Sequence, residues 1–372
     1  MARFIGLMSG TSLDGVDAAL VESDDSEGPM RELAFAHLPF DPALRTELLA
    51  LNAPGPDELH RAALAGNSLS RVYARAVAQL LAEAGLSATQ VDALGAHGQT
   101  VRHRPREFDG VGYTLQLLNG SLLAELTGVD VVCDLRSRDL AAGGIGAPLV
   151  PAFHAAVFAR AGRDVAVLNL GGIANLTLLP AAGAVGGFDC GPGNVLMDLW
   201  TQRHRQQPYD ENGQWAASGH ADSRLLHALL AEPFMSMAPP KSTGRDLFNA
   251  PWLDARLAAA GADLPVADIM ATLAEFTARG AADALRATLP AVQTLLVCGG
   301  GAFNAHLLSR LGRLVPAGVE VRSTESEGAA PDRVEALAFA WLAREHLARR
   351  PGNLPAVTGA GGPRVLGALY PA

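Results

Sequence analysis

The sequence predicts an α/β protein made of two similar halves. Its 372 residues are too many for one small domain and suggest two, each large enough to bury a core. An apolar β-hairpin with a glycine-containing turn opens each half, over residues 4–21 in the first and 165–179 in the second. Strands and helices alternate after each hairpin, which is the element order of an α/β fold.

The composition indicates a globular protein and argues against several classes of partner. Hydrophobic residues make up 49% of the chain and charged residues 18%, and the net charge of -9 gives no footprint for nucleic acid or an anionic membrane. Cys133, Cys190 and Cys298 are far apart and lack metal-ligand spacing, which argues against disulfides and a zinc site. No signal peptide precedes the first hairpin and no apolar segment approaches about 20 residues, so we expect a cytoplasmic protein.

In the first half, the apolar pattern predicts three strands, a long helix, and then two strands separated by a short helix. Apolar residues from Leu69 to Leu80 recur at helical spacing, and Gly85 ends that helix. The expected strands cover residues 4–8, 16–21, around 33–38, 91–95 and 129–133, and the short helix covers 120–126.

The second half repeats this order, which predicts a duplicated architecture with a cleft between the halves. A hairpin is followed by an acidic loop that opens a helix, then by a long helix, a strand, a glycine loop and a last helix. The expected ranges are 165–170 and 173–179 for the hairpin, 187–194 for the acidic loop, 195–201, 269–289, 294–298, 299–301 and 334–347.

The turn of the first hairpin has the composition of a phosphate-binding loop. It combines glycines, hydroxyls and a carboxylate: Gly10, Thr11, Ser12, Asp14 and Gly15. Glycines let the backbone approach phosphates closely. In the second hairpin the turn is Gly171-Gly172, with Asn175 after it. We therefore expect a nucleotide triphosphate held between the two turns; an ordinary glycine turn is the alternative for each hairpin taken alone.

Asp189 is the candidate for chemistry on water. It is expected between a strand and a helix, where a carboxylate can accept a proton or hold a hydrated magnesium ion. A helix N-cap is the alternative. The loop 299–301 lacks the spacing of a dinucleotide-binding fingerprint, so we expect it to pass close to the adenosine, with Asn304 capping the next helix.

Several polar side chains offer donors to an anionic substrate. Those near the end of the strand at 91–95 are His97, Gln99, Arg102, His103 and Arg104, and Arg136 and Arg138 follow the strand at 129–133. Ligands of open α/β sheets bind beyond the carboxyl ends of strands, and arginine favours bidentate pairing with carboxylates. Surface arginines in loops are the alternative, and Lys241 in its proline-stiffened loop can be interpreted either way.

Taken together, these motifs resemble the anhydro-N-acetylmuramic acid kinase family, a branch of the sugar kinase/Hsp70/actin superfamily. The matching stretches run in order along nearly the whole chain: 6–17, 95–103, 133–151, 168–177, 188–200, 239–248, 296–306 and 335–342. Where the superfamily usually carries an aspartate ahead of Gly-Thr, this chain has Met8, so another carboxylate such as Asp14 or Asp189 must serve that role.

The resemblance implies two RNase H-like domains with a nucleotide cleft between them, covering residues 1–134 plus 350–372 and residues 135–349. It also implies ATP and Mg²⁺ as cofactors and 1,6-anhydro-N-acetylmuramic acid as substrate. Water attacks the anomeric carbon, O6 leaves, and O6 takes the γ-phosphoryl group to give N-acetylmuramate 6-phosphate. Phosphoryl capture replaces much of the protonation that a glycosidase supplies with a second carboxylic acid, so one base, Asp189, suffices.

By the same resemblance, His97, Gln99, Arg136 and Glu335 contact the sugar, Asp14 binds the metal, and the enzyme is a homodimer. The expected ATP contacts are Gly10, Thr11, Ser12, Leu13, Asp14, Gly15, Val16, Asp17, Gly171, Gly172, Asn175, Gly191 and Gly300. One alternative is another sugar or carboxylic-acid kinase of the same fold. The other is a non-catalytic ATP-gated binding module, whose relatives carry long insertions or an appended domain that this chain lacks.

Overall fold

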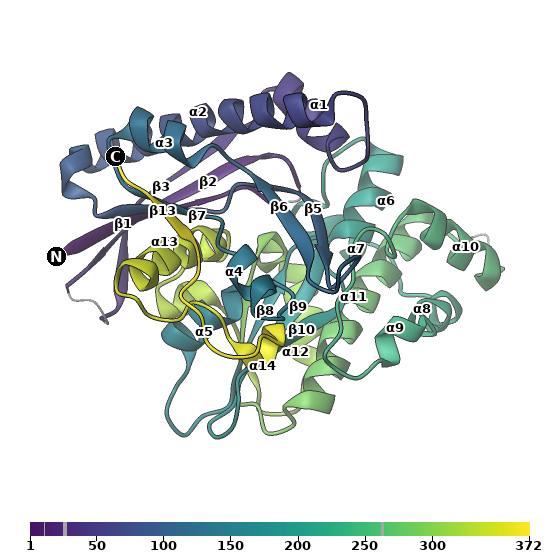
Figure 1. Ribbon diagram of the computed structural model, residues 1–372. Coiled ribbons are helices and arrows are strands. Elements are labelled where there is room, and N and C mark those ends of the chain that lie inside the picture. The colour runs from purple at the N-terminus through teal and green to yellow at the C-terminus, as the bar shows by residue number, and fades with distance from the viewer. Residues whose placement is uncertain (11, 25–27, 262–263) are drawn as a thin grey trace. The chain divides into compact units, whose positions relative to one another are not determined.

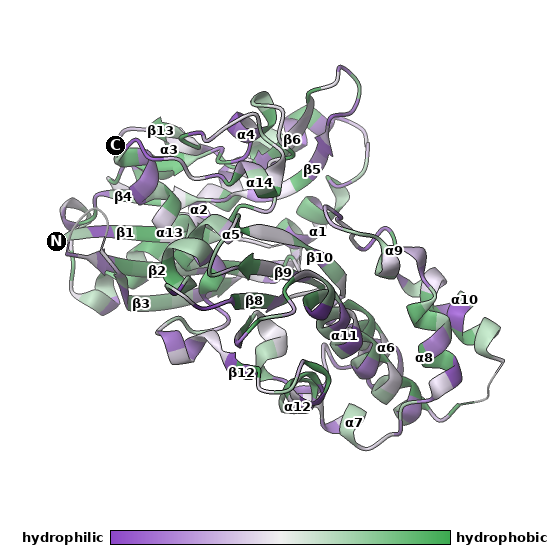
Figure 2. Ribbon diagram, turned by 90° about the horizontal axis from the view of Figure 1, so that it is seen from below, coloured by the Kyte–Doolittle hydropathy of each residue, from purple (hydrophilic) through white to green (hydrophobic). Residues whose placement is uncertain are grey.

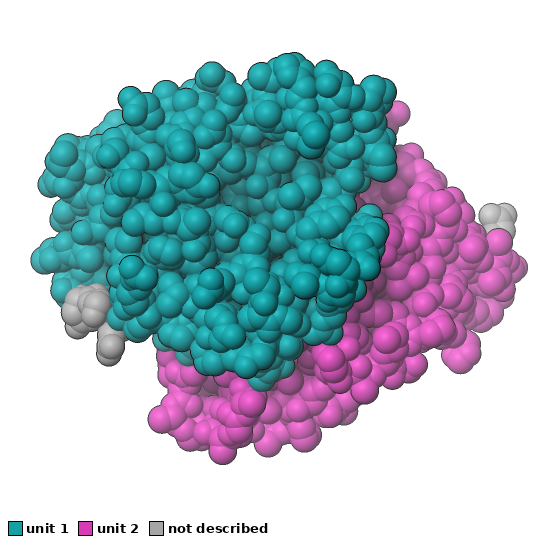
Figure 3. Space-filling model, in the orientation of Figure 1, with its two compact units in different colours: residues 1–157, 333–372 teal, residues 158–332 magenta. Residues whose placement is uncertain are grey.

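The computed structural model describes residues 1–10, 12–24, 28–261 and 264–372. Its contacts divide the chain into two compact units: residues 1–157 with 333–372 form unit 1, and residues 158–332 form unit 2 (Figure 3). The boundaries expected from the sequence were 134/135 and 349/350, so unit 1 also includes most of the helix at 150–158 and the whole helix at 334–347. That sequence-based division into domains stays a prediction, because compactness alone does not define an independently folding domain.

Unit 1 is built on a six-stranded sheet in the order β13-β7-β4-β1-β2-β3 (Figure 1). Strands β1, β2 and β3 pair antiparallel with one another in sequence order. Strands β4 and β7 run parallel to β1, and β13 is an antiparallel edge strand. The bounds are β1 Ala2–Met8, β2 Gly15–Ser23, β3 Met30–Pro39, β4 Ala93–Ala96, β7 Val131–Cys133 and β13 Ala368–Tyr370.

Helices cover both faces of this sheet. Apolar side chains of α2 (Glu58–Ala84) pack in one core with Ile5 and Leu7 of β1. On the other face, α13 (Val334–Leu347) comes very close, because Gly6 and Gly95 are register partners without side chains. A Cβ on either glycine would collide with a backbone oxygen of α13. The remaining elements are α1 Pro42–Ala50, η1 Ala88–Gln90, α3 Gly120–Thr127, α4 Ser137–Ala141, α5 Val150–Phe158, α14 Pro355–Thr358 and the hairpin β5 Gln99–Pro105 with β6 Gly112–Leu117.

Unit 2 is built on a five-stranded sheet in the order β10-β9-β8-β11-β12. Its strands are β8 Val165–Leu170, β9 Ile173–Leu179, β10 Gly186–Pro192, β11 Thr294–Cys298 and β12 Glu320–Ser323. The long helix α11 (Val266–Thr288) places Phe276 and other apolar residues in the core with Leu168 of β8. The other helices are α6 Val195–Arg205, η2 Glu211–Gly213, α7 Gln214–Ala217, α8 Ser223–Leu230, α9 Pro233–Ser236, α10 Ala250–Ala260, η3 Gly300–Phe303, α12 Ala305–Leu314 and η4 Thr324–Glu327.

The two sheets share one topology. Three consecutive antiparallel strands are followed by two strands parallel to the first, in the order β3-β2-β1-β4-β7 in unit 1 and β10-β9-β8-β11-β12 in unit 2. The predicted fold class, two α/β domains of the RNase H-like kind led by hairpins, is thereby confirmed.

One local prediction was wrong. The stretch around Asp189 is not a loop before a helix: residues 186–192 form β10, an edge strand. The polar residues at 99–105, for which the sequence predicted no element, form β5, the first strand of a separate hairpin. Apolar residues dominate the strands of both sheets, whereas the helices carry mixed faces (Figure 2). Within the described residues, the structure has no helix both long and apolar enough to cross a bilayer.

Candidate active site

The turn between β1 and β2 presents a small polar surface. Ser12 Oγ donates a hydrogen bond of 2.7 Å to Asp14 Oδ1, and both residues are exposed. Leu13, by contrast, is buried in the core although its φ is 55°, and Val16 is fully buried, so only the backbone of either residue can reach a ligand. Thr11 lies outside the described residues.

Side chains at the carboxyl ends of β4 and β7 meet in a buried polar cluster of unit 1. Arg136 donates from Nε and Nη2 to His97 Nε2 at 3.1 and 2.9 Å, and from Nη1 to the Gly146 carbonyl at 2.8 Å. His97 Nδ1 lies 2.7 Å from the Gly98 carbonyl, so this nitrogen carries the proton and Nε2 accepts. Burial, reinforced by Arg136, lowers the pKa of His97 to about 3, which keeps the imidazole neutral.

Gln99 and Glu335 border this cluster. Gln99 Nε2 donates to the Gly10 carbonyl at 3.1 Å, which links β5 to the first turn. Its Oε1 is buried and has no hydrogen-bond partner, a costly state that a ligand donor would relieve. Burial raises the pKa of Glu335. The positive charge of Arg136 opposes this shift and the negative charge of Asp17 adds to it, so Glu335 interacts electrostatically with both. The pKa of Arg136 falls to about 10 through burial.

Asp189 lies in β10 beside a β-bulge. Its register partner is Asn175 in β9, whose partner in β8 is Asn169, so three polar residues form a row across the sheet. Directly opposed residues point to the same face of a sheet. Gly191, at the bulge, has φ 148°, a backbone conformation that disfavours other residues, so this glycine has a structural explanation without a nucleotide.

The loop after α9 holds one oxygen of Asp189. Ser242 Oγ and the Thr243 backbone N–H each donate to Asp189 Oδ2 at 2.9 Å. The Asp189 N–H donates to the Lys241 carbonyl at 3.2 Å. Burial raises the pKa of Asp189, and these two hydrogen bonds and the Lys241 charge only partly oppose that shift. The carboxylate is therefore oriented and more basic than an exposed aspartate, as a general base requires.

The second glycine turn and the glycine loop lie beyond the carboxyl ends of the parallel strands β8 and β11. The Gly171 and Gly172 carbonyls accept hydrogen bonds from the residues that begin α6. Gly299 packs against β8 with φ 78°, leaving no room for a Cβ. Gly300 is exposed, and a Cβ there would meet nothing within 4 Å. Gly172 and Gly300 thus offer open backbone to a ligand.

Metal-ligating side chains do not form a cluster in the part of the chain that the structure describes. Within the described ranges, no three histidine, cysteine or carboxylate side chains come together as metal ligands. Mg²⁺ in nucleotide enzymes is commonly held by one or two carboxylates together with substrate phosphates. Asp14, exposed and bonded through only one oxygen to Ser12, fits that kind of site, so its metal role stays a prediction.

A comparison of the sequence with models of known families identifies the family of this chain. The sequence model of one family, described as anhydro-N-acetylmuramic acid kinase, matches residues 2–372. The chain belongs to the anhydro-N-acetylmuramic acid kinase family. The resemblance seen in the sequence motifs is confirmed.

Relatives of this kinase match it over almost their whole length. An anhydro-N-acetylmuramic acid kinase of Variovorax paradoxus is 63% identical over 99% of this chain and 99% of the relative. An anhydro-N-acetylmuramic acid kinase of Cupriavidus pinatubonensis is 55% identical over 99% of this chain and 98% of the relative. Among solved structures, the activator of the 2-hydroxyisocaproyl-CoA dehydratase from Clostridium difficile with bound ADPNP is 10% identical, with a TM-score of 0.48 over 93% of this chain and 96% of that one. A likeness of that size carries no functional inference.

The structure of this kinase adds site residues that the sequence did not single out. Ser242 and Thr243 bind Asp189 from more than 50 residues further along the chain, and the proline-stiffened loop that carries them is the only signal in the sequence. Asn169 was hidden in an apolar strand; its polar side chain amid apolar neighbours was the available signal. Asp198 on α6 has a pKa raised to about 7 by burial, which Arg245 only partly opposes.

The structure brings the predicted residues of each unit together. His97, Gln99, Arg136 and Glu335 meet in unit 1, near the first turn. In unit 2, Asp189 of β10 is the register partner of Asn175 of β9, and the second turn joins β8 to β9 in the same sheet. Their roles toward ATP and sugar stay predictions.

Proposed function

We propose that the chain uses ATP and water to convert 1,6-anhydro-N-acetylmuramic acid into N-acetylmuramate 6-phosphate, a reaction of peptidoglycan recycling. Family membership and relatives of that name at 63% and 55% identity support this reaction. The structural observation that carries the proposal is the Asp189 carboxyl, whose Oδ2 is fixed by Ser242 and Thr243. Among the described residues, its Oδ1 accepts no hydrogen bond and is available to a water molecule.

In the proposed reaction Asp189 takes one proton from water as the water oxygen bonds to the anomeric carbon. The bond between the anomeric carbon and O6 breaks, and O6 keeps the electron pair. O6 then bonds to the γ-phosphorus of ATP, and ADP leaves. Because the phosphoryl group neutralises the departing oxygen, one carboxylate serves where a glycosidase uses two. The raised pKa of Asp189 increases its affinity for the proton.

The polar cluster of unit 1 is proposed to bind the sugar. Arg136 uses three N–H groups on His97 and Gly146 and keeps two for the lactyl carboxylate. The unbonded Oε1 of Gln99 can accept from a sugar hydroxyl or amide. Glu335, with its raised pKa, can donate or accept at a sugar oxygen.

ATP contacts are proposed for the first turn, residues 10–17, and for Gly171, Gly172, Asn175, Gly191 and Gly300. When bound, Mg²⁺ would neutralise phosphoryl charge, with Asp14 as its protein ligand. We also propose that the kinase acts in the cytoplasm, where ATP is supplied, and as a homodimer. Light scattering on the purified protein tests the dimer directly.

Mass analysis of products formed in 18O-labelled water tests the reaction. The proposal predicts the label on the anomeric hydroxyl of the product and none on the transferred phosphate. Labelled phosphate would contradict it. Offering the anhydro sugar and its ring-opened form separately distinguishes the alternatives: phosphorylation of the ring-opened sugar alone indicates a different sugar kinase. ATP turnover that ignores every sugar indicates a nucleotide-gated binding module.

A further inference from the structure

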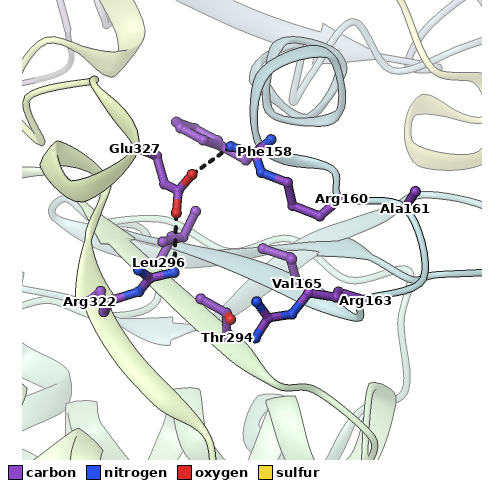
Figure 4. Close-up of a pocket in the computed structure, with 9 residues that line it drawn as sticks. All are labelled: Phe158, Arg160, Ala161, Arg163, Val165, Thr294, Leu296, Arg322 and Glu327. Atoms are coloured by element: carbon purple, nitrogen blue, oxygen red, sulfur yellow. Dashed lines mark hydrogen bonds and ion pairs between the residues drawn. The ribbon is translucent and has the colours of Figure 1, made fainter.

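Unit 2 has a pocket of about 300 Å³ at the end of its sheet where β8 and β11 begin (Figure 4). Val165 and Thr294, the first residues of the parallel strands β8 and β11, line it. Gly171 and Gly300 follow the carboxyl ends of these same strands. Along β8 that separation is about 17 Å, given a rise of about 3.3 Å per residue. The pocket is therefore separate from the ATP contacts proposed within unit 2, Gly171 and Gly300.

Three arginines and one glutamate supply the charges of the pocket. Glu327 accepts from Arg160 Nη2 at 2.5 Å and from Arg322 Nη2 at 3.1 Å, with one carboxylate oxygen for each (Figure 4). Glu320, which does not line the pocket, lies 3.8 Å from Arg322 Nε. Within the part of the chain that the structure describes, the Arg163 guanidinium has neither an ion pair nor a hydrogen bond. The pocket keeps an excess of positive charge, and Arg163 is the free cation.

The free guanidinium points toward an unpaired hydroxyl. Thr294 is only 3% exposed, and among the described residues its side chain makes no hydrogen bond. Its register partner is Val165, so these two side chains face the same side of the sheet, and Arg163 from the preceding turn lines the same pocket. Figure 4 shows the Arg163 side chain extending toward Thr294. The Thr294 hydroxyl lines the pocket, so one ligand acceptor could bind it together with Arg163.

The turn before β8 positions the two arginines on its flanks. The Arg163 N–H donates to the Arg160 carbonyl at 3.2 Å, and Gly162 between them has φ 73°, which glycine adopts without strain. Phe158 and Leu296 add apolar walls. The volume lies at the lower end of the range for small-molecule sites, which suits a compact metabolite.

We propose that this pocket binds a small anionic metabolite through a phosphate group. The phosphate oxygens accept hydrogen bonds from Arg163, from the Arg322 guanidinium and from the Thr294 hydroxyl. A phosphate dianion matches the excess of positive charge, and guanidinium forks suit its geometry. The proposal is independent of the reaction proposed above, because none of these residues belongs to the candidate active site. Its ligand is either inorganic phosphate or a phosphomonoester.

Calorimetric titration of the full chain tests this proposal. Inorganic phosphate and glucose 6-phosphate serve as probes, at constant ionic strength and with the active site saturated by a non-hydrolysable ATP analogue. R163Q removes the free guanidinium from an exposed position, and T294V removes the hydroxyl with little change of shape. R313Q, an exposed arginine of α12 outside the pocket, is the matched control.

We expect R163Q to weaken binding of the probe by about tenfold or more and T294V by about threefold, with R313Q unchanged. Preference for inorganic phosphate or for the ester identifies which source of phosphate the pocket uses. Absence of binding by the unmodified protein, or equal affinity in R163Q and R313Q, would overturn the proposal. Kinase turnover of R163Q in phosphate-free buffer should equal that of the unmodified protein, so failure of the pocket proposal leaves the proposed reaction intact.

Discussion

The backbone N–H of Thr243 donates a 2.9 Å hydrogen bond to Oδ2 of Asp189, a residue 54 positions earlier in the chain. Ser242 Oγ donates to the same oxygen. Two donors on one oxygen restrict rotation of the carboxylate, and among the described residues its other oxygen accepts no hydrogen bond. The free oxygen is the one proposed to take the proton of water.

Replacing Asp189 by asparagine keeps the shape of the side chain and removes its ability to accept a proton. We expect D189N to lose ring-opening and phosphorylation together by roughly a hundredfold or more, because both follow from the attack of water. ATP binding should stay near its original affinity, measured by calorimetry with a non-hydrolysable analogue. Near-normal turnover of D189N would remove Asp189 from the mechanism.

If Asp189 is the proposed base, we expect the hydrogen bond from Ser242 to influence the pH dependence of catalysis. Asp189 must be ionised to act as a base, so kcat/KM falls as the pH drops through its pKa. Ser242 stabilises the ionised form, and its removal raises the pKa further. We expect S242A to move the acidic limb of the pH profile upward by up to about one unit.

S236A is the matched control for S242A. Ser236 is a nearby serine of unit 2 whose Oγ donates to the Pro233 carbonyl and not to a site residue. Its pH profile should coincide with that of the unmodified enzyme. A downward shift, or no shift, in S242A would show that the serine does not tune Asp189.

The repeated hairpins were readable from the sequence because each depends on local chemistry. Apolar runs flank glycine turns, and β1, β2, β8 and β9 form where such runs predict. β11 and α13 begin and end at the predicted residues, and Asn304 caps α12 by accepting from Leu307 N. Periodicity and capping are properties of a few neighbouring residues, so a single sequence reveals them.

The surroundings of Asp189 were not readable in this way. The glycines and the proline around Asp189 predict a loop. The segment nevertheless forms a strand, because tertiary pairing with β9 overrides local propensity. The loop that holds its carboxylate comes from more than 50 residues away. The sequence offered His97 and Arg136 only as separate donors past two strand ends. Their mutual hydrogen bonds depend on burial that no short pattern encodes.

Two adjacent glycines separate a structural role from a ligand-binding role. Gly299 has φ 78°, and a Cβ there would collide with Asn169 Oδ1, so G299A should destabilise unit 2 by more than about 1 kcal/mol. Gly300 is open, so G300A should leave the unfolding midpoint nearly unchanged and raise KM for ATP several-fold by obstructing the close approach of the nucleotide. Unchanged KM for ATP in G300A, measured beside a normal KM for sugar, would exclude Gly300 from the nucleotide site.

Asp198 makes the stability of the protein fall as the pH rises through the acidic range. Burial raises its pKa from 3.8 to about 7 in the folded protein. Below about pH 4 the carboxyl is protonated in both the folded and the unfolded states. Between about pH 4 and 7 the folded state keeps a proton that the unfolded chain has released, so the free energy of unfolding declines with pH and levels off above about pH 7. The decline is at most about 4 kcal/mol, and partial exposure of the side chain reduces it.

Asparagine at this position cannot ionise, so D198N abolishes the penalty. The difference in denaturation midpoint between D198N and the unmodified protein should grow in favour of D198N from about pH 5 to about pH 8. D246N, which alters an exposed aspartate of the same unit, should show a difference that does not change with pH in this way. If D198N and D246N follow the same pH dependence, the Asp198 carboxyl is ionised in the folded protein throughout this range, and burial on α6 does not control its proton.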